Sequence, residues 1–199
     1  MSKSSAVRIT QAVGATYVDL QTAAVATLEQ DAPRAPVQAK PVVLSADGAM
    51  VPLLHGEWGE VRSLAIGTVT GTVTGTVTGK PLSAKTATAE VKTSEISYFS
   101  RLVSAEEFTR LALVETHGRG VANAPTVAAV TDGADWLQGL VDHHCPRAVR
   151  ILDFAHAAQR IAAVGQALWG EQPSQAAQGW AEAWTHRLKH DGPDCLLTE

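Results

Sequence analysis

Residues 125–136, PTVAAVTDGADW, hold the pattern that decides the fold. The apolar run at residues 127–130 stops at Thr131-Asp132-Gly133, and a helical pattern starts at Ala134. A short buried strand that is followed by an acid and then by a helix is typical of open α/β sheets, whose ligands bind at the carboxyl ends of the strands. We therefore expect the chemistry of the protein at this edge of the sheet.

Two other apolar runs also end in an aspartate. Residues 41–47, PVVLSAD, end at Asp47, and residues 148–153, AVRILD, end at Asp153 and continue to His156. Two carboxylates at the ends of neighbouring strands can hold a pair of divalent cations about 4 Å apart. Aspartate suits Mg²⁺, which prefers hard oxygen ligands.

Composition and charge narrow the class of protein. The chain has 199 residues, of which 45% are hydrophobic and 18% charged, so we expect a globular fold with a sizeable core. Its net charge of −4 lacks the basic excess of an isolated nucleic-acid-binding domain. Cys145 and Cys195 have no CxxC spacing, which favours a reduced cytoplasm. No apolar run reaches the roughly 18 residues of a membrane span, so we expect no membrane association.

The order of elements predicts the architecture. Residues 1–40 are expected to form a helical and linker segment, with an amphipathic helix at 16–30 and a proline-containing linker at 31–40. Residues 41–170 are expected to form the core domain, and residues 171–199 the start of a helical insertion. Within these segments, strands are predicted at 42–44, 61–66, 95–103, 126–131 and 148–152, and helices at 104–118, 134–143, 154–169 and 176–189.

This order, β-β-β-α-β-α-β-α-α, is that of a ribonuclease H-like mixed sheet with flanking helices. In such sheets the first and fourth strands lie side by side. The aspartates that end these two strands, Asp47 and Asp132, are therefore expected to converge although they are far apart in the sequence.

Each candidate residue also has a plain structural interpretation. Asp47-Gly48 suits a hairpin turn. Asp132 and Asp153 can each cap the helix that follows, and His156 can be a packed core residue instead of a site residue. The repeat GTVTGTVTGTVTG at residues 67–79 is best explained as an insertion that lengthens a hairpin or forms a loop.

Several motifs together resemble a known family. Residues 43–67 (VLSADGAMVPLLHGEWGEVRSLAIG) and 129–159 (AVTDGADWLQGLVDHHCPRAVRILDFAHAAQ), with the helix start SAEEF at 104–108, resemble the ISKra-type insertion-sequence transposases. These are relatives of the Mutator-like DDE transposases. The resemblance covers about residues 41–170, and the ordered combination of DGAMV, GEWGEV, DGADW and ILDFAHA is more specific than any single motif.

The resemblance implies a ribonuclease H-like fold and DNA strand cleavage and transfer that depend on Mg²⁺ or Mn²⁺. It implies that Asp47 and Asp132 are catalytic metal ligands. Asp153 and His156 match an Asp-x-x-His motif that shapes the site or contacts DNA, and Trp58 and Glu60 match a family signature. The implied partner is transposon-end DNA, and a homo-oligomer is compatible with the resemblance.

In this family the third catalytic acid, a glutamate, follows a helical insertion, and we expect the chain to end inside that insertion. We therefore expect the chain alone to be a weak or inactive catalyst. The local basic candidates for DNA contact are Arg147, Arg150 and Arg160, for which a solvated face is the simpler interpretation. Two alternatives stay open: a non-catalytic remnant that binds DNA or a partner protein, and another metal-dependent phosphohydrolase.

Overall fold

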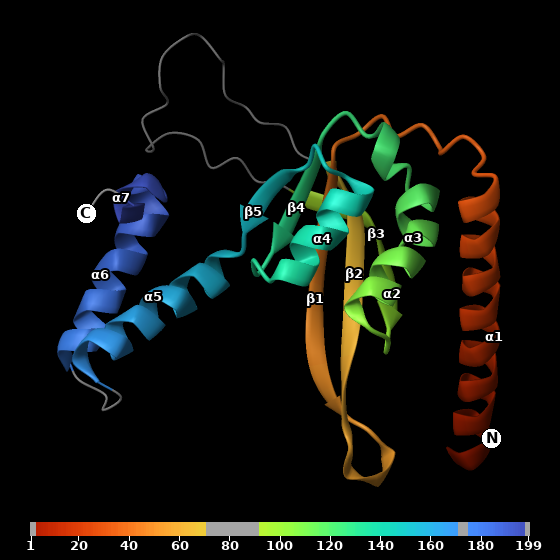
Figure 1. The fold of residues 1–199 in the computed structure, drawn as a ribbon, viewed down its shortest axis with the longest axis horizontal. Coiled ribbons are helices and arrows are strands. Elements are labelled where there is room, and N and C mark those ends of the chain that lie inside the picture. The colour runs from red at the N-terminus through yellow and green to blue at the C-terminus, as the bar shows by residue number, and fades with distance from the viewer. Residues whose placement is uncertain (1–2, 71–91, 171–174, 198–199) are drawn as a thin grey trace. The chain divides into compact units, whose positions relative to one another are not determined.

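The computed structural model describes residues 3–70, 92–170 and 175–197 (Figure 1). The chain divides into two compact units, of which the first comprises the described residues up to Ile151 and the second those from Leu152 onward. Each unit is described by itself. None of the helices in these residues has the length and hydropathy needed to cross a bilayer.

A five-stranded mixed sheet forms the centre of the fold, in the order β3-β2-β1-β4-β5. The β1–β2 and β2–β3 pairs are antiparallel, whereas β1 and β4 are parallel. The expected mixed α/β sheet with flanking helices is confirmed. The strands are β1 (Val42–Pro52), β2 (Trp58–Thr70), β3 (Lys92–Arg101), β4 (Val127–Thr131) and β5 (Val149–Leu152).

Helices flank the sheet in the first unit and make up most of the second (Figure 1). The first unit contains α1 (Lys3–Gln30), α2 (Ala105–Leu111), α3 (Leu113–Gly118), α4 (Asp135–His144) and the short 3₁₀ helices η1 (Leu54–Gly56) and η2 (Val121–Asn123). The second contains α5 (Phe154–Trp169), α6 (Gln175–Asp191) and α7 (Asp194–Leu197). On α6, Trp180 and Trp184 are four residues apart and lie on one helix face, with their ring centroids 5.6 Å apart.

The core lies between one face of the sheet and helices of the first unit. Alternation along β1 buries Val42, Leu44 and Ala46 and leaves Ser45 and Asp47 exposed on the other face. The buried β1 side chains belong to one cluster with residues of the other strands and of α1, α2 and α4, including Leu64, Ile66, Phe99, Phe108, Val25, Leu137 and Leu140.

The start of α2 is set by Ser104, as the sequence predicts. Its hydroxyl accepts a hydrogen bond from the Glu107 backbone N–H at 3.2 Å. Ser104 and Glu107 have the sequence spacing of a capping box, but the Glu107 carboxylate instead binds Arg110 through two hydrogen bonds of 2.8 and 2.9 Å. A guanidinium one helical turn away is the stronger partner for this carboxylate.

The first helix is longer than predicted and has a different buried face. α1 begins at Lys3, and within the predicted helix at 16–30 Val25 is fully buried, whereas Val18 and Leu20 are exposed. The reason is that α1 packs against α2 and α3 only through its C-terminal turns. Residues 32–39, which lie within the predicted linker, have neither helix nor strand structure.

The predicted turn at Asp47-Gly48 is wrong. β1 continues to Pro52, and Gly48 pairs with Arg62 inside the β1–β2 ladder. The local preference of Asp-Gly for a turn is overridden, because the residues on both sides of it continue the strand pairing. Of the threonine-rich repeat, Gly67–Thr70 ends β2 with Thr68 buried, and residues 71–79 lie outside the described residues.

Candidate functional site

The register of β1 and β4 brings Asp47 and Asp132 to the same end of neighbouring strands. The parallel ladder pairs Val42 with Val127 and ends with Ser45 paired with Val130. Each aspartate follows two residues after its strand's last paired position. Because the strands run in the same direction, the two carboxylates leave the ladder at the same level.

Each of these aspartates is held by a nearby backbone amide. The exposed Asp47 accepts a 2.7 Å hydrogen bond at Oδ1 from the Gly48 N–H. The half-buried Asp132 accepts a 2.8 Å bond at Oδ1 from the Ala134 N–H. Gly133, with φ of 87°, makes the turn between Asp132 and α4 in a backbone conformation that favours glycine. Both carboxylates keep their Oδ2 atoms without a hydrogen-bond partner in the described residues.

The predicted helix-cap role of Asp132 is realised in a modified form. The N-cap residue of α4 is Ala134, and Asp132 binds the N–H of that residue instead of a helical one. The carboxylate therefore fixes the turn between β4 and α4. This arrangement keeps Asp132 at the end of β4, where its second oxygen can meet a ligand.

The donor set of the two aspartates fits a hard cation in part. Carboxylate oxygens are the ligands that Mg²⁺ and Mn²⁺ take from proteins, and Mg²⁺ keeps several waters. Within the described ranges, no group of three or more His, Cys, Asp or Glu side chains is placed to hold a metal ion. A cation at Asp47 and Asp132 would therefore draw its other ligands from water or substrate.

Asp153 and His156 form a local pair in the second unit. Asp153 is the N-cap of α5, and its Oδ1 accepts a 3.2 Å hydrogen bond from the Ala155 N–H. Its Oδ2 lies 3.0 Å from His156 Nδ1. The Ala155 N–H, and then His156, hold the pKa of Asp153 below its usual value. Asp153 therefore caps α5, as the sequence allows, and contacts His156 through its other oxygen.

The three candidate arginines do not form a cationic patch in either unit. In the first unit Arg147 is exposed, whereas Arg150 forms an ion pair with Asp142 and donates a 2.6 Å hydrogen bond to Gln138. Arg160 belongs to the second unit, where it lines a hollow together with Trp180 and Trp184. The Arg150–Asp142 pair reduces the positive charge available to a phosphate backbone.

A polar cluster around Arg62 was not foreseen from the sequence. The guanidinium of Arg62 pairs with Glu60, donates to the Val103 carbonyl and lies 5.4 Å from the centroid of the Trp136 ring. Glu60 and Arg62 are two residues apart in β2 and therefore share one face of the strand. This two-residue spacing is a sequence signal for the Glu60–Arg62 ion pair. The sequence alone does not indicate that Trp136 lies beside them. Trp58 is 64% exposed.

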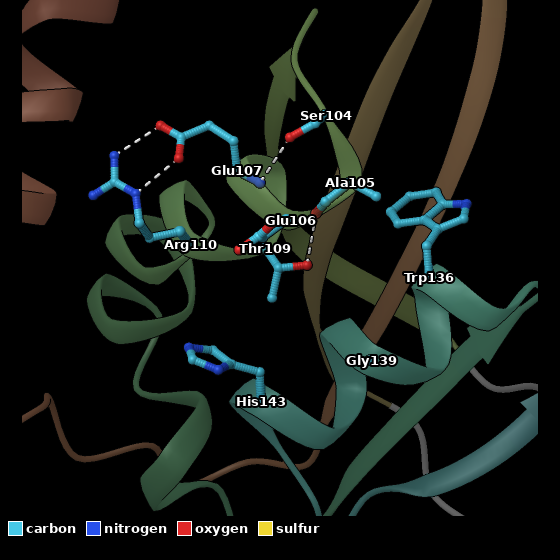
Figure 2. A pocket seen from close by; sticks show the side chains of 9 residues that line it. All are labelled: Ser104, Ala105, Glu106, Glu107, Thr109, Arg110, Trp136, Gly139 and His143. Carbon is cyan, nitrogen blue, oxygen red and sulfur yellow. Dashed lines mark hydrogen bonds and ion pairs between the residues drawn. The ribbon is translucent and has the colours of Figure 1, made fainter.

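A hollow of about 760 Å³ lies between α2 and α4 (Figure 2). On α4, Trp136, Gly139 and His143 follow one helix face, and Gly139 leaves space in the middle of it. On the α2 side, Arg110 is turned toward Glu107, with which it forms a 2.8 Å ion pair. The hollow therefore has no unpaired arginine with which to recognise an anion.

Comparison of the chain with models of known protein families, with curated proteins and with solved structures finds no match. The function must therefore be inferred from the motifs and from the geometry of the chain's own residues.

Proposed function

We propose that the chain carries the core of a DDE-class insertion-sequence transposase with a ribonuclease H-like sheet. The observation that carries the proposal is the parallel β1–β4 register, which brings Asp47 and Asp132 to the same end of neighbouring strands. The strand order β3-β2-β1-β4-β5 supports it, because this order makes β1 and β4 neighbours despite their distance in sequence. The ordered motifs around both aspartates supply the family.

The chain's own residues have defined parts in this proposal. Asp47 and Asp132 would hold the divalent cations, while the Gly48 and Ala134 N–H groups fix the orientation of the carboxylates through Oδ1. When bound, Mg²⁺ or Mn²⁺ activates a water or a 3′-hydroxyl and stabilises the leaving oxygen of a phosphodiester. Asp153 orients His156 through the 3.0 Å contact within the second unit, and this pair contacts DNA in the proposal.

A second candidate is a non-catalytic protein that binds DNA or a partner. It is favoured by the structural roles of the same acids, since Asp132 fixes the β4–α4 turn and Asp153 caps α5. In this case the aspartates stabilise local structure and bind no cation. The two candidates therefore differ in metal binding, which can be measured without any assay of transposition.

The test is a calorimetric titration of the chain with Mn²⁺ and Mg²⁺, alongside Asp47→Ala and Asp132→Ala. Glu57→Ala serves as the control, because Glu57 is an exposed acid in the connection between β1 and β2. We expect binding to the wild type and to Glu57→Ala, and loss of binding in both aspartate variants. Equal binding by all four proteins, or no binding by the wild type, would contradict the two-metal site.

A further inference from the structure

The helix α1 has two parts with different surroundings. Its C-terminal turns are anchored: Val25 is fully buried, Gln21 accepts a hydrogen bond from Arg101, and Glu29 pairs with Arg110 at 3.0 Å. Residues 7–20, in contrast, are all exposed. Figure 1 shows α1 as one straight helix at the side of the first unit. About half of the helix therefore has no covered face in the first unit.

The exposed part carries a second apolar stripe. We define the α1 seam as the residues Ala6, Ile9, Val13, Thr16, Leu20 and Ala23. The intervals between them alternate between three and four residues, which is the spacing that two packed helices require. The largest of its side chains are strongly exposed, at 51% for Ile9, 63% for Val13 and 65% for Leu20.

The seam faces away from the body of the first unit. Leu20 and Val25 are five residues apart, and at about 100° per residue they point about 140° from each other around the helix axis. Val25 faces the core. A helix that packs on the seam would therefore meet α1 on the side that α2 and α3 leave uncovered.

The sequence of the exposed part does not favour an isolated helix. Residues 7–18 contain six β-branched residues and a glycine, namely Val7, Ile9, Thr10, Val13, Thr16, Val18 and Gly14. These residues lower helix propensity. Helices in proteins take most of their stability from packing of an apolar face. The exposed part of α1 therefore requires a partner surface.

We propose that the seam is covered by the α1 seam of a second copy of this chain, in an antiparallel two-helix interface. In this register Ile9 of each copy lies opposite Leu20 of the other, Val13 opposite Thr16, and Ala6 opposite Ala23. The arrangement is self-complementary, as a twofold interface must be. It is also independent of the proposed transposase function.

Charge complementarity favours this occupant and this direction. Arg8 and Asp19 are the charged residues within residues 4–28. In the antiparallel register Arg8 of one copy lies within one helical turn of Asp19 of the other, so that two opposite-charge pairs flank the seam. A parallel pairing would instead bring Arg8 level with Arg8 and Asp19 level with Asp19, which is unfavourable.

The first experiment measures the mass of the full chain by light scattering and sedimentation from low micromolar to several hundred micromolar. We expect a concentration-dependent rise from 20.9 kDa toward twice that value. Val13→Lys and Leu20→Lys should raise the dimer dissociation constant about tenfold or more, because each places two charges in the interface. Ala15→Lys, an exposed α1 position outside the seam, should behave as the wild type.

These side chains are exposed in the monomer, so the lysine variants should retain the circular dichroism spectrum of the monomeric wild type. A wild type that stays monomeric over the whole concentration range would overturn the proposal. Dimers that form equally well in Val13→Lys, Leu20→Lys and Ala15→Lys would overturn it too, because another surface would then be responsible.

The second experiment tests the direction of the two helices by disulfide formation in a Cys195→Ser background. Cys145 is retained because it is buried, and burial raises the pKa of its thiol to about 11. Chains with Ile9→Cys are mixed with tagged chains that carry Leu20→Cys and are oxidised mildly. We expect mixed disulfides in excess of both homodisulfides. Homodisulfides of Ile9→Cys as the main product would overturn the antiparallel arrangement.

Discussion

The two halves of β1 lie in contrasting environments although they belong to one strand. Residues 42–45 pair with β2 on one side and β4 on the other, and Leu44 is fully buried. Residues 46–52 pair with β2 alone, and Met50 near the end of the strand is 59% exposed. The first half is stabilised by apolar burial, and the second mainly by its backbone ladder. Asp47 lies two residues after Ser45, the last residue of β1 that pairs with β4, and its side chain is exposed to solvent.

The largest effect is expected for Leu44→Ala in the buried half. Truncation of a fully buried leucine removes apolar contacts and leaves a cavity, at a cost of about 2–5 kcal/mol in the free energy of unfolding. Met50→Ala is the matched control in the exposed half, for which we expect a change of about 0.5 kcal/mol or less. Urea unfolding followed by circular dichroism measures both. Equal losses in the two variants would refute the proposed contrast between the halves.

A pH-dependent effect on the free energy of unfolding is expected at His144 of α4, which contacts α2 and α3. His144 donates through Nε2 to the Thr109 carbonyl at 2.7 Å, and its Nδ1 lies 3.1 Å from the Thr116 hydroxyl. Burial lowers the pKa of His144 from 6.5 to about 4, against the opposing effect of the Thr109 carbonyl. The folded state therefore holds this imidazole neutral in a pH range where the unfolded chain protonates it.

Because the unfolded chain binds the extra proton, this contribution to stability is complete above pH 6.5 and is lost as the pH falls toward 4. The loss should approach about 3 kcal/mol, since each pKa unit corresponds to about 1.4 kcal/mol. Unfolding free energies of His144→Gln, measured across this range, should show a shallower pH dependence than the wild type. Parallel curves for the wild type and His144→Gln would contradict the assignment.

The smallest effect is expected for Arg62→Ala, because Arg62 pairs with Gly48 in the second half of β1 and makes only polar and ring contacts beyond that pairing. The variant leaves the Glu60 carboxylate and the Val103 carbonyl without their donor and removes the guanidinium beside Trp136. We expect a loss of about 1–2 kcal/mol in unfolding free energy. Arg147→Ala, at an exposed arginine, is the control and should change stability by about 0.5 kcal/mol or less. A loss as large as that of Leu44→Ala would contradict the expected difference between the two halves of β1.

Much of the fold could be predicted because its signals are local. Apolar runs that end in turns or acids identified the five strands, although β1 and β2 extend beyond the predicted ends. Ser104 identified the start of α2 because a helix N-terminus needs a side-chain acceptor. The strand-end positions of Asp132 and Asp153 were predictable to the same degree, since these residues directly follow apolar runs that form β4 and β5.

The sequence by itself determined the order of elements, the strand-end acids and the apolar face of each core strand, because these depend on residue type and short-range periodicity. The tertiary structure alone decided three other features. It extended β1 through Asp47-Gly48, since cross-strand pairing outweighs a local turn preference. It placed Arg62 beside Trp136, a contact between residues far apart in the chain. It also set the alignment of Asp47 with Asp132, because the register of a parallel ladder depends on how two distant strands pack on a common core.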